Sequence, residues 1–253
     1  MKKLLIAILG IAGLTAIASA QNYVINSVPY TINSPGYYLL VRDIFSNANA
    51  KITITASNVV LNLGGHTLQV SSTDECVLAE GEGPVHPVTN VTIQNGALVN
   101  NLAGCIFLVS ANGCAIDHVA ATSAGQCTLF DISGANNLIS NCIFVSGNPA
   151  SLQGPVGPHG PGLSTVALLG CGDVIEHNIV TSTDPFWGSI GSGTTGAAPS
   201  MVGNAVRNNV IHSHPALSGP SVNLDQYDVY IGNLFPGRPQ GATNVNGGIH
   251  ATE

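Results

Sequence analysis

The sequence has few charged residues and very few basic ones. Only 8% of its 253 residues are Asp, Glu, Lys or Arg, against roughly a quarter in an average soluble domain. Six residues are Lys or Arg, and the formal net charge is −7. Because binding to a phosphate backbone needs clusters of basic side chains, this composition excludes nucleic acid as a partner. Gly, Asn, Ser and Thr supply the polarity instead, and with abundant Val and Ile they favour turn-rich, all-β structure over helices.

Recognisable motifs for zinc binding, redox chemistry or nucleophilic catalysis are also missing. No two cysteines are separated by two residues, and Ser, Cys and His form no known nucleophile motif. Six cysteines are nevertheless present, namely Cys76, Cys105, Cys114, Cys127, Cys142 and Cys171. In an exported protein they could pair in any of fifteen connectivities, or they could serve as small buried apolar side chains. The sequence leaves both alternatives open.

Long apolar runs are absent after the first twenty residues. Those residues combine Lys2 and Lys3, an apolar run, and the small residues Ala18-Ser19-Ala20. This pattern is typical of a secretory signal with its cleavage site, so we expect a secreted protein, periplasmic or extracellular, that starts near Gln21 and does not span a membrane. Removing the signal would leave four basic and 13 acidic residues, a net charge of 4 − 13 = −9.

A short phrase recurs along the chain. The stretch NVVLNLGGHTLQV, residues 58–70, alternates apolar and polar residues, and weaker copies follow it. Each copy has an apolar anchor two residues before a polar turn residue. The anchors are Leu61, Ile93, Ile116, Ile139, Ile175, Val206 and, more loosely, Tyr230. Three of the six intervals are 23 or 24 residues, and the other three are longer by 8 to 13. Repeats of this length indicate a solenoid.

The repeat has neither a leucine-rich consensus nor a helical period. It therefore predicts a single-stranded parallel β-helix of about seven or more coils, with anchors stacked directly on one another. The residue two after each anchor should lie at a bend, where Asn tolerates the left-handed conformation. We further expect Asn178, Asn209 and Asn233 to stack as an amide ladder. Glu176 and Arg207, on neighbouring coils, should form an ion pair.

The stretches PGYYLLVRDI and ITITASNVVLNLGGHTLQV resemble the start of right-handed parallel β-helix proteins of the pectate-lyase-like superfamily. The resemblance covers Tyr23 to Phe235. It implies an amino-terminal cap and first coil. Together with the signal and the repeat, the predicted organisation is a signal peptide at residues 1–20, the cap and first coil at 21–57, the β-helix proper at 58–237 and a carboxy-terminal tail at 238–253.

The same resemblance implies action on polysaccharides by a lyase, a glycoside hydrolase or an epimerase. Lyases on this fold use clustered aspartates with calcium and a basic residue, and hydrolases use paired aspartates with G-H-G and R-x-K motifs. The chain has no Asp-Asp pair, no G-H-G and no R-x-K. No catalytic residue can therefore be assigned, enzymatic activity stays open, and the resemblance identifies neither a cofactor nor a metal site.

Insertions in the long intervals suggest where a ligand would bind. Two of them begin eight residues past Ile139 and Ile175, and His214 lies eight past Val206. These loops should lie side by side, and they carry the candidate ligand-binding residues His159, Asp184, Trp187, His212 and His214. Trp187, the only tryptophan, could stack on a sugar ring. Alternatively the histidines are simply solvated and Trp187 packs onto the rod, and two imidazoles alone do not make a metal site.

The leading hypothesis from the sequence is an exported protein that binds a surface or extracellular polysaccharide, and processing of that polymer stays open. The alternative is a structural or adhesive protein of the cell envelope, in which the coils act as a spacer and the loops contact other proteins. The two hypotheses predict different results when a glycan is added. The fluorescence of Trp187 should shift under the first and stay unchanged under the second.

Overall fold

The computed structural model describes residues 22–47, 50–124, 128–147, 165–182, 189–192, 203–213, 222–223, 228–236, 245–246 and 249–250. Within these ranges the regular secondary structure is entirely β-strand, and every strand pairing is parallel. The prediction of an all-β chain with parallel strands is confirmed. The described part of the chain contains no helix able to cross a membrane.

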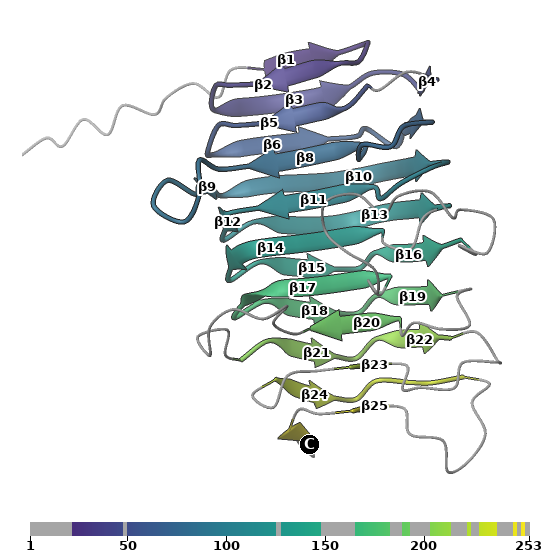
Figure 1. Ribbon diagram of the computed structural model, residues 1–253. Coiled ribbons are helices and arrows are strands. Elements are labelled where there is room, and N and C mark those ends of the chain that lie inside the picture. Colours follow the sequence, from purple (N-terminus) through teal and green to yellow (C-terminus); the bar gives the residue numbers. More distant parts are fainter. Residues whose placement is uncertain are drawn as a thin grey trace, which may run out of the picture.

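The strands belong to two sheets, and the chain passes between them as it descends the stack (Figure 1). The main path of the first sheet consists of β1 (Asn22–Ile25), β3 (Gly36–Leu40), β6 (Val59–Asn62), β10 (Val91–Asn100), β13 (Ala115–Ser123), β15 (Leu138–Ser140), β18 (Val174–Glu176), β21 (Ala205–Arg207), β24 (Val229–Ile231) and β26 (Ile249–His250). Five more strands belong to this sheet and lie beside the main path. They stack on the second halves of the long strands β10 and β13, either directly or through one another. They are β4 (Ile44–Ser46), β7 (Thr67–Val70), β16 (Ile143–Ser146), β19 (Ile179–Ser182) and β22 (Val210–His212).

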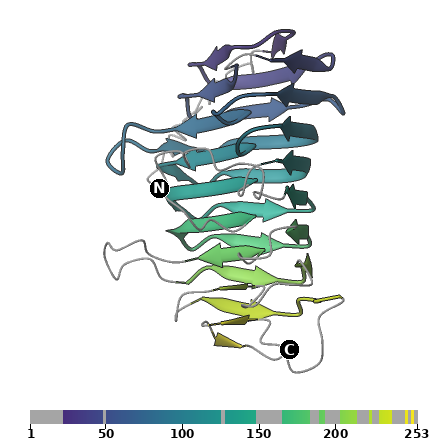
Figure 2. The same cartoon turned by 45° about the vertical axis from the view of Figure 1, so that its right-hand side comes forward.

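The second sheet faces the first across the stack (Figure 2). Its strands are β2 (Tyr30–Ile32), β5 (Ile52–Ile54), β8 (Val77–Glu80), β11 (Ile106–Val109), β14 (Leu129–Ala135), β17 (Val166–Cys171), β20 (Ile190–Ser192), β23 (Val222–Asn223) and β25 (Val245–Asn246), with the short β9 (Val88–Thr89) and β12 (Ala111–Asn112) alongside. β25 and β26 fall in the segment predicted as a tail, and they pair with β23 and β24. We use the word layer for one passage of the chain through both sheets.

The predicted stacking of the repeat is confirmed residue by residue. In-register pairing links all the anchors into one column, namely Leu61, Ile93, Ile116, Ile139, Ile175, Val206 and Tyr230. The first six are buried, because alternation along each strand directs them between the two sheets. Toward the amino terminus the column continues through Tyr38 and Tyr23, whose rings stack 4.5 Å apart. The anchor column is thus aliphatic from Leu61 to Val206, with tyrosine rings beyond both ends.

Sharp bends follow the anchor strands where the sequence predicts them. The residues two after six of the anchors have positive φ angles between 52° and 64°, and these residues are Asn95, His118, Asn141, His177, Asn208 and Gly232. The first repeat differs, because Leu63 is fully buried and the positive φ angles belong to Gly64 and Gly65. A Cβ on Gly96 in the next layer would lie 2.4 Å from the Leu63 Cβ. The missing side chain of Gly96 therefore makes room for Leu63, and the chain turns one residue later.

The predicted amide ladder is present, and it begins one layer earlier than expected. Oδ1 of Asn178 accepts the Cys142 N–H at 2.8 Å, Oδ1 of Asn209 accepts the Asn178 N–H at 2.9 Å, and Oδ1 of Asn233 accepts the Asn209 N–H at 2.9 Å. The amide Nδ2 of each Asn donates to a backbone carbonyl in the layer before it, at 2.8 to 3.0 Å. At the head of the ladder the Cys142 sulfur accepts the Val119 N–H at 3.5 Å, as an Asn oxygen would.

A second ladder, which the sequence analysis did not identify, runs along the other end of the same short strands. Its members are the residues two before the anchors, namely Cys114, Asn137, Asp173, Asn204 and Asp228. From Asn137 on, a side-chain oxygen of each member accepts the backbone N–H of the member before it, at 2.8 to 2.9 Å. All five side chains are buried. The short strands of the main path are therefore held at both ends by side-chain to backbone hydrogen bonds between layers.

Asp173 is expected to be a less stabilising member of this ladder than Asn would be. Nδ2 of Asn137 donates to the Ala111 carbonyl, and Nδ2 of Asn204 donates to the Gly170 carbonyl. An ionised carboxylate in this position cannot donate a hydrogen bond, whereas the amide of Asn can. Asp173→Asn should therefore raise the free energy of unfolding by about 1 kcal/mol at neutral pH, measured by urea denaturation. The matched reverse change, Asn204→Asp, should lower it, and a loss of stability in both variants would contradict the argument.

Candidate functional site

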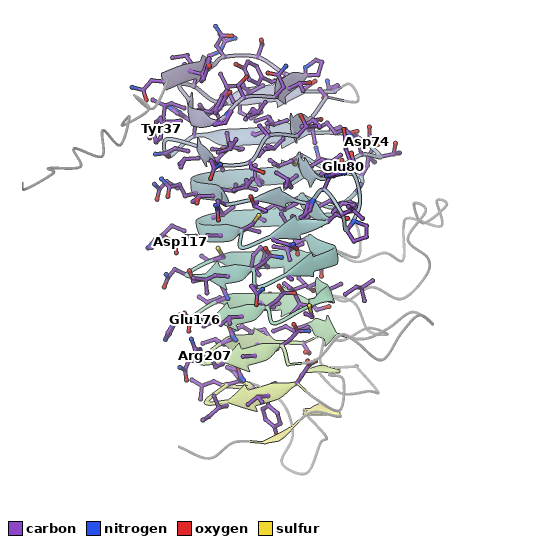
Figure 3. All side chains as sticks on the ribbon, turned by 90° about the vertical axis from the view of Figure 1, so that its left-hand side faces the viewer. Tyr37, Asp74, Glu80, Asp117, Glu176 and Arg207 are labelled. Carbon is purple, nitrogen blue, oxygen red and sulfur yellow. The ribbon has the colours of Figure 1, made fainter. Side chains whose placement is uncertain are left out.

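A strip of polar side chains lies on the outer surface of the first sheet, where its short strands meet the bends. We define the polar strip as Asp117, His118, Ser140, Asn141, Glu176, His177 and Arg207. Four of these residues occupy one outward column of paired positions, in successive layers, and the others are bend residues. Figure 3 shows Asp117, Glu176 and Arg207 on the same edge of the stack. Residues 90 positions apart in the sequence thus form one continuous surface.

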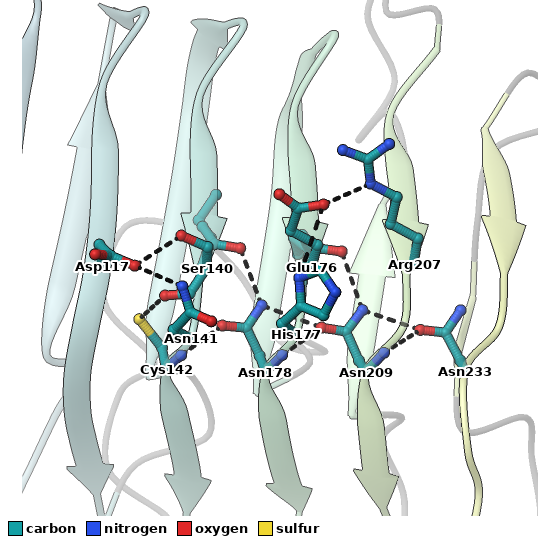
Figure 4. A network of polar contacts seen from close by, with 12 residues as sticks. Asp117, Ser140, Asn141, Cys142, Glu176, His177, Asn178, Arg207, Asn209 and Asn233 are labelled. Atoms are coloured by element: carbon teal, nitrogen blue, oxygen red, sulfur yellow. Dashed lines mark hydrogen bonds and ion pairs between the residues drawn. The ribbon is translucent and has the colours of Figure 1, made fainter.

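Asp117 is the centre of the upper half of the strip as drawn in Figure 3. This half lies at the left in Figure 4. Oδ1 of Asp117 accepts hydrogen bonds from the Ser140 hydroxyl and from the Asn141 amide, both at 2.9 Å. Its Oδ2 lies 2.7 Å from Nδ1 of His118. The His118 side chain is 62% exposed, and its Nδ1 is held by Asp117. The imidazole ring is therefore fixed by one contact while most of its side chain lies on the surface.

Hydrogen bonding keeps Asp117 ionised. Its partial burial alone would raise the pKa of the carboxyl, but the hydrogen bonds from Asn141, His118 and Ser140 outweigh that effect and lower the pKa below its usual value. A depressed pKa in the folded state means that Asp117 contributes stability above its unfolded pKa and loses that contribution as the pH falls through the folded pKa. At neutral pH the group is therefore a fixed negative charge and a hydrogen-bond acceptor.

Glu176 and Arg207 form the lower half of the strip. Nε of Arg207 donates to Oε2 of Glu176 at 2.6 Å, so the predicted ion pair between neighbouring layers is confirmed. The Glu176 side chain is 18% exposed and the Arg207 side chain 46%. His177 Nδ1 lies 3.9 Å from the same Glu176 oxygen. An acidic residue followed directly by histidine therefore occurs twice on the strip, at Asp117-His118 and at Glu176-His177. The two dipeptides are two layers apart, and Ser140 and Asn141 lie between them.

The strip is supported by a rigid backbone. The bend residues His118, Asn141 and His177 are each followed by an inward residue, and from Asn141 on these inward residues belong to the first ladder.

Aliphatic side chains border the strip on the neighbouring outward positions. Leu138 is 38% exposed on one side of the bend, and Ile143 and Ile179 are 46% and 41% exposed on the other. Polar groups flanked by exposed aliphatic carbons suit a ligand with both hydroxyl groups and C–H faces.

Of the five predicted ligand-binding residues, the structure describes one. His212 ends β22 and is half-buried, and its paired neighbour is Thr181. Its carbonyl accepts a hydrogen bond from the Ser189 hydroxyl at 3.1 Å. His212 lies on the strand beyond the bend and does not belong to the polar strip. His159, Asp184, Trp187 and His214 lie outside the described residues, so the loop site remains a prediction.

A separate concavity lies on the loop after β8, which the sequence shows as an insertion. It has a volume of about 360 Å³ and is lined by Thr55, Glu80, Gly81, Glu82, His86, Pro87 and Val88. Glu80 lies on the opposite edge of the stack from the polar strip (Figure 3). Across the residues that the structure describes, no three His, Cys, Asp or Glu side chains come together in a group able to hold a metal ion.

The sequence contained the signal for the strip, but it was not recognised as a site. The spacing of the repeat identifies the outward column, and it predicts the Glu176–Arg207 pair as an ion pair between layers. The additional signal is the repeated acid-histidine dipeptide at Asp117-His118 and Glu176-His177, each directly after an anchor.

Comparison of the chain with protein-family models, with curated proteins and with solved structures finds no match.

Proposed function

We propose that the chain is an exported right-handed parallel β-helix protein, of the pectate-lyase-like kind, that binds a linear surface or extracellular polysaccharide along the polar strip. The observation that carries the proposal is the line of hydrogen-bonding side chains on successive layers, Asp117, Ser140, Glu176 and Arg207. Neighbouring parallel strands are about 4.8 Å apart. Such a rigid, evenly spaced row suits a polymer whose hydroxyl groups also recur at a regular interval.

The charges of the strip favour an uncharged sugar polymer over a polyuronate. Asp117 is ionised, and the positive charge of Arg207 is already paired with Glu176. The whole chain also carries a formal charge of −7. A polymer rich in carboxylates would meet repulsion and no unpaired cation on the strip. Neutral hydroxyl groups, in contrast, can donate to Asp117 and accept from His118, Asn141 or Arg207.

Binding is favoured over cleavage. Glycoside hydrolysis requires two carboxyl groups, one of them with a raised pKa so that it can act as an acid. On the strip the pKa of Asp117 is lowered, and Glu176 is bound to Arg207. Neither group is suited to protonate a leaving oxygen. A lyase, a hydrolase or an epimerase therefore gains no support from these residues, and a non-enzymatic role is preferred.

The proposal is tested by retention of the purified protein on gels that contain a neutral glucan, a neutral mannan or a polygalacturonate. We expect retention by a neutral polymer and a roughly tenfold weaker affinity, about 1.4 kcal/mol, for Asp117→Ala and for Arg207→Ala. Glu82→Gln, in the concavity that Glu80 also lines, is the matched control and should bind normally. Trp187→Ala distinguishes the predicted loop site. If it alone abolishes binding, the ligand sits on the loops and not on the strip.

The second candidate is a structural or adhesive protein of the cell envelope. It is supported by the long, rigid stack with buried ladders, which would serve as a spacer without any ligand. Failure of every glycan to retain the protein would favour this role and reject the first.

A further inference from the structure

Two buried cysteines lie against each other in the stack. Cys76 and Cys105 each immediately precede a strand of the second sheet, and the residues that follow them, Val77 and Ile106, are paired in register. Cys76 N–H donates to the Cys105 carbonyl at 3.0 Å. Both side chains are fully buried. The two residues therefore occupy the same position in successive layers.

The thiols also point the same way. The Cys76 sulfur lies 3.5 Å from the Val99 carbonyl oxygen. The Cys105 sulfur lies 3.2 Å from the carbonyl oxygen of Thr122, which pairs with Val99, and 3.7 Å from that of Leu98. The thiol contact with Cys105, followed by burial, raises the pKa of Cys76 well above its usual value. In-register residues on neighbouring parallel strands are about 4.8 Å apart, which falls within the range of about 4.4–6.8 Å for Cα atoms joined by a disulfide.

We propose that Cys76 and Cys105 are a disulfide-forming pair that joins two adjacent layers of the stack when the chain folds under oxidising conditions. Oxidation removes the hydrogen from each sulfur and forms one Sγ–Sγ bond. Two electrons and two protons pass to an oxidant: glutathione disulfide is reduced to two glutathione thiols, or the disulfide of a thiol oxidoreductase is reduced to its dithiol. The structure shows the reduced form of the pair. This proposal does not depend on the glycan-binding role.

The pair should be reactive only while the chain is unfolded. A disulfide is formed by attack of a thiolate, and in the folded protein Cys76 is buried and its raised pKa keeps it protonated. No oxidant can approach a side chain of zero exposure without opening of the layers. Folding in the presence of a disulfide oxidant should therefore give the bridge, whereas the same oxidant should leave the folded, reduced protein unchanged.

The experiment uses the full chain, reduced in denaturant and divided into two parts. One part is refolded in glutathione disulfide, and the other is refolded in reductant and then exposed to glutathione disulfide. Each part is then unfolded without reductant, in the presence of a reagent that alkylates free thiols. It is digested, and its peptides are analysed by mass spectrometry. We expect a peptide pair linked through Cys76 and Cys105 in the first part only. The bridged protein should melt about 7–14 °C higher than the reduced one, since the link closes a loop of 29 residues.

Two buried cysteines serve as matched controls. The Cys114 and Cys142 sulfurs contact backbone groups, so Cys114→Ser and Cys142→Ser should retain the Cys76–Cys105 link. Full alkylation of Cys76 and Cys105 after oxidative refolding of the unaltered chain would overturn the proposal, as would a bridge from either residue to a different cysteine. The measurement on the unaltered chain needs no variant to fold.

Discussion

Replacing Asn209 by Ala is expected to lower the free energy of unfolding by about 2–4 kcal/mol. Asn209 is fully buried in the middle of the first ladder. Its Oδ1 accepts the N–H of Asn178, and its Nδ2 donates to the Ile175 carbonyl and to Oδ1 of Asn233. Alanine leaves the Asn178 N–H and the Ile175 carbonyl without these partners in a region that water does not reach. Buried polar groups without a partner each cost about 1–3 kcal/mol.

The loss is measured by chemical denaturation, with Asn101→Ala as the matched control. Asn101 is exposed, and its Nδ2 donates one hydrogen bond to the Ser71 hydroxyl. Its replacement should change stability by less than about 0.5 kcal/mol, as is usual for surface positions. Equal effects of the two substitutions would mean that the ladder adds nothing beyond an ordinary surface hydrogen bond.

A second large loss is expected for Phe144→Ala, about 3–5 kcal/mol. Phe144 is completely buried and is among the largest side chains of the core. It pairs with Ala121 on one side and Val180 on the other, which are both buried. Truncation removes the transfer free energy of the ring and leaves a cavity that the hydrogen-bonded layers cannot close. The measurement is again the midpoint and slope of urea unfolding.

The neighbouring residue provides the control for Phe144. Ile143 is on the same strand, but alternation directs it outward, and it is 46% exposed. Ile143→Ala should cost less than about 1 kcal/mol, since little of its surface is removed from water. A loss for Ile143→Ala as large as that for Phe144→Ala would show that the outward face of β16 is covered by another part of the protein.

Much of the stacking could be predicted from the sequence, because a parallel in-register stack repeats the same environment at every layer. Ile116 and Ile139 are 23 residues apart and lie directly on one another. The Asn178–Asn209–Asn233 ladder and the Glu176–Arg207 pair follow from the same register. Each of these predictions uses only the spacing of like residues.

Other features could not be derived from spacing. The second ladder does not follow from residue type because its members differ, from Cys114 through Asn137 to Asp173, although Asn137 and Asp173 accept the same kind of hydrogen bond. Its position two residues before each anchor would have identified it. The buried position of Leu63 depends on space left by Gly96 in another layer, and a single repeat does not contain that information.

The prediction of the site depended on residue type more than on position. Trp187 and the loop histidines stand out because aromatic and imidazole groups often contact ligands, whereas the polar strip consists of common polar residues, of which Ser140 is buried. Its distinctive property is the alignment of Asp117, Ser140 and Glu176 across layers, which exists only once the register is known.

The corner at Gly64 and Gly65 shows how such a protein can change without losing its architecture. Leu61 pairs with Ile93 before this corner and Thr67 pairs with Ala97 after it, although four residues connect Asn62 to Thr67 and only two connect Gln94 to Ala97. Extra residues are thus absorbed at a turn while the strands on both sides keep their partners. Evolution or protein engineering can therefore lengthen corners one at a time and reshape the surface beside them while the scaffold stays the same.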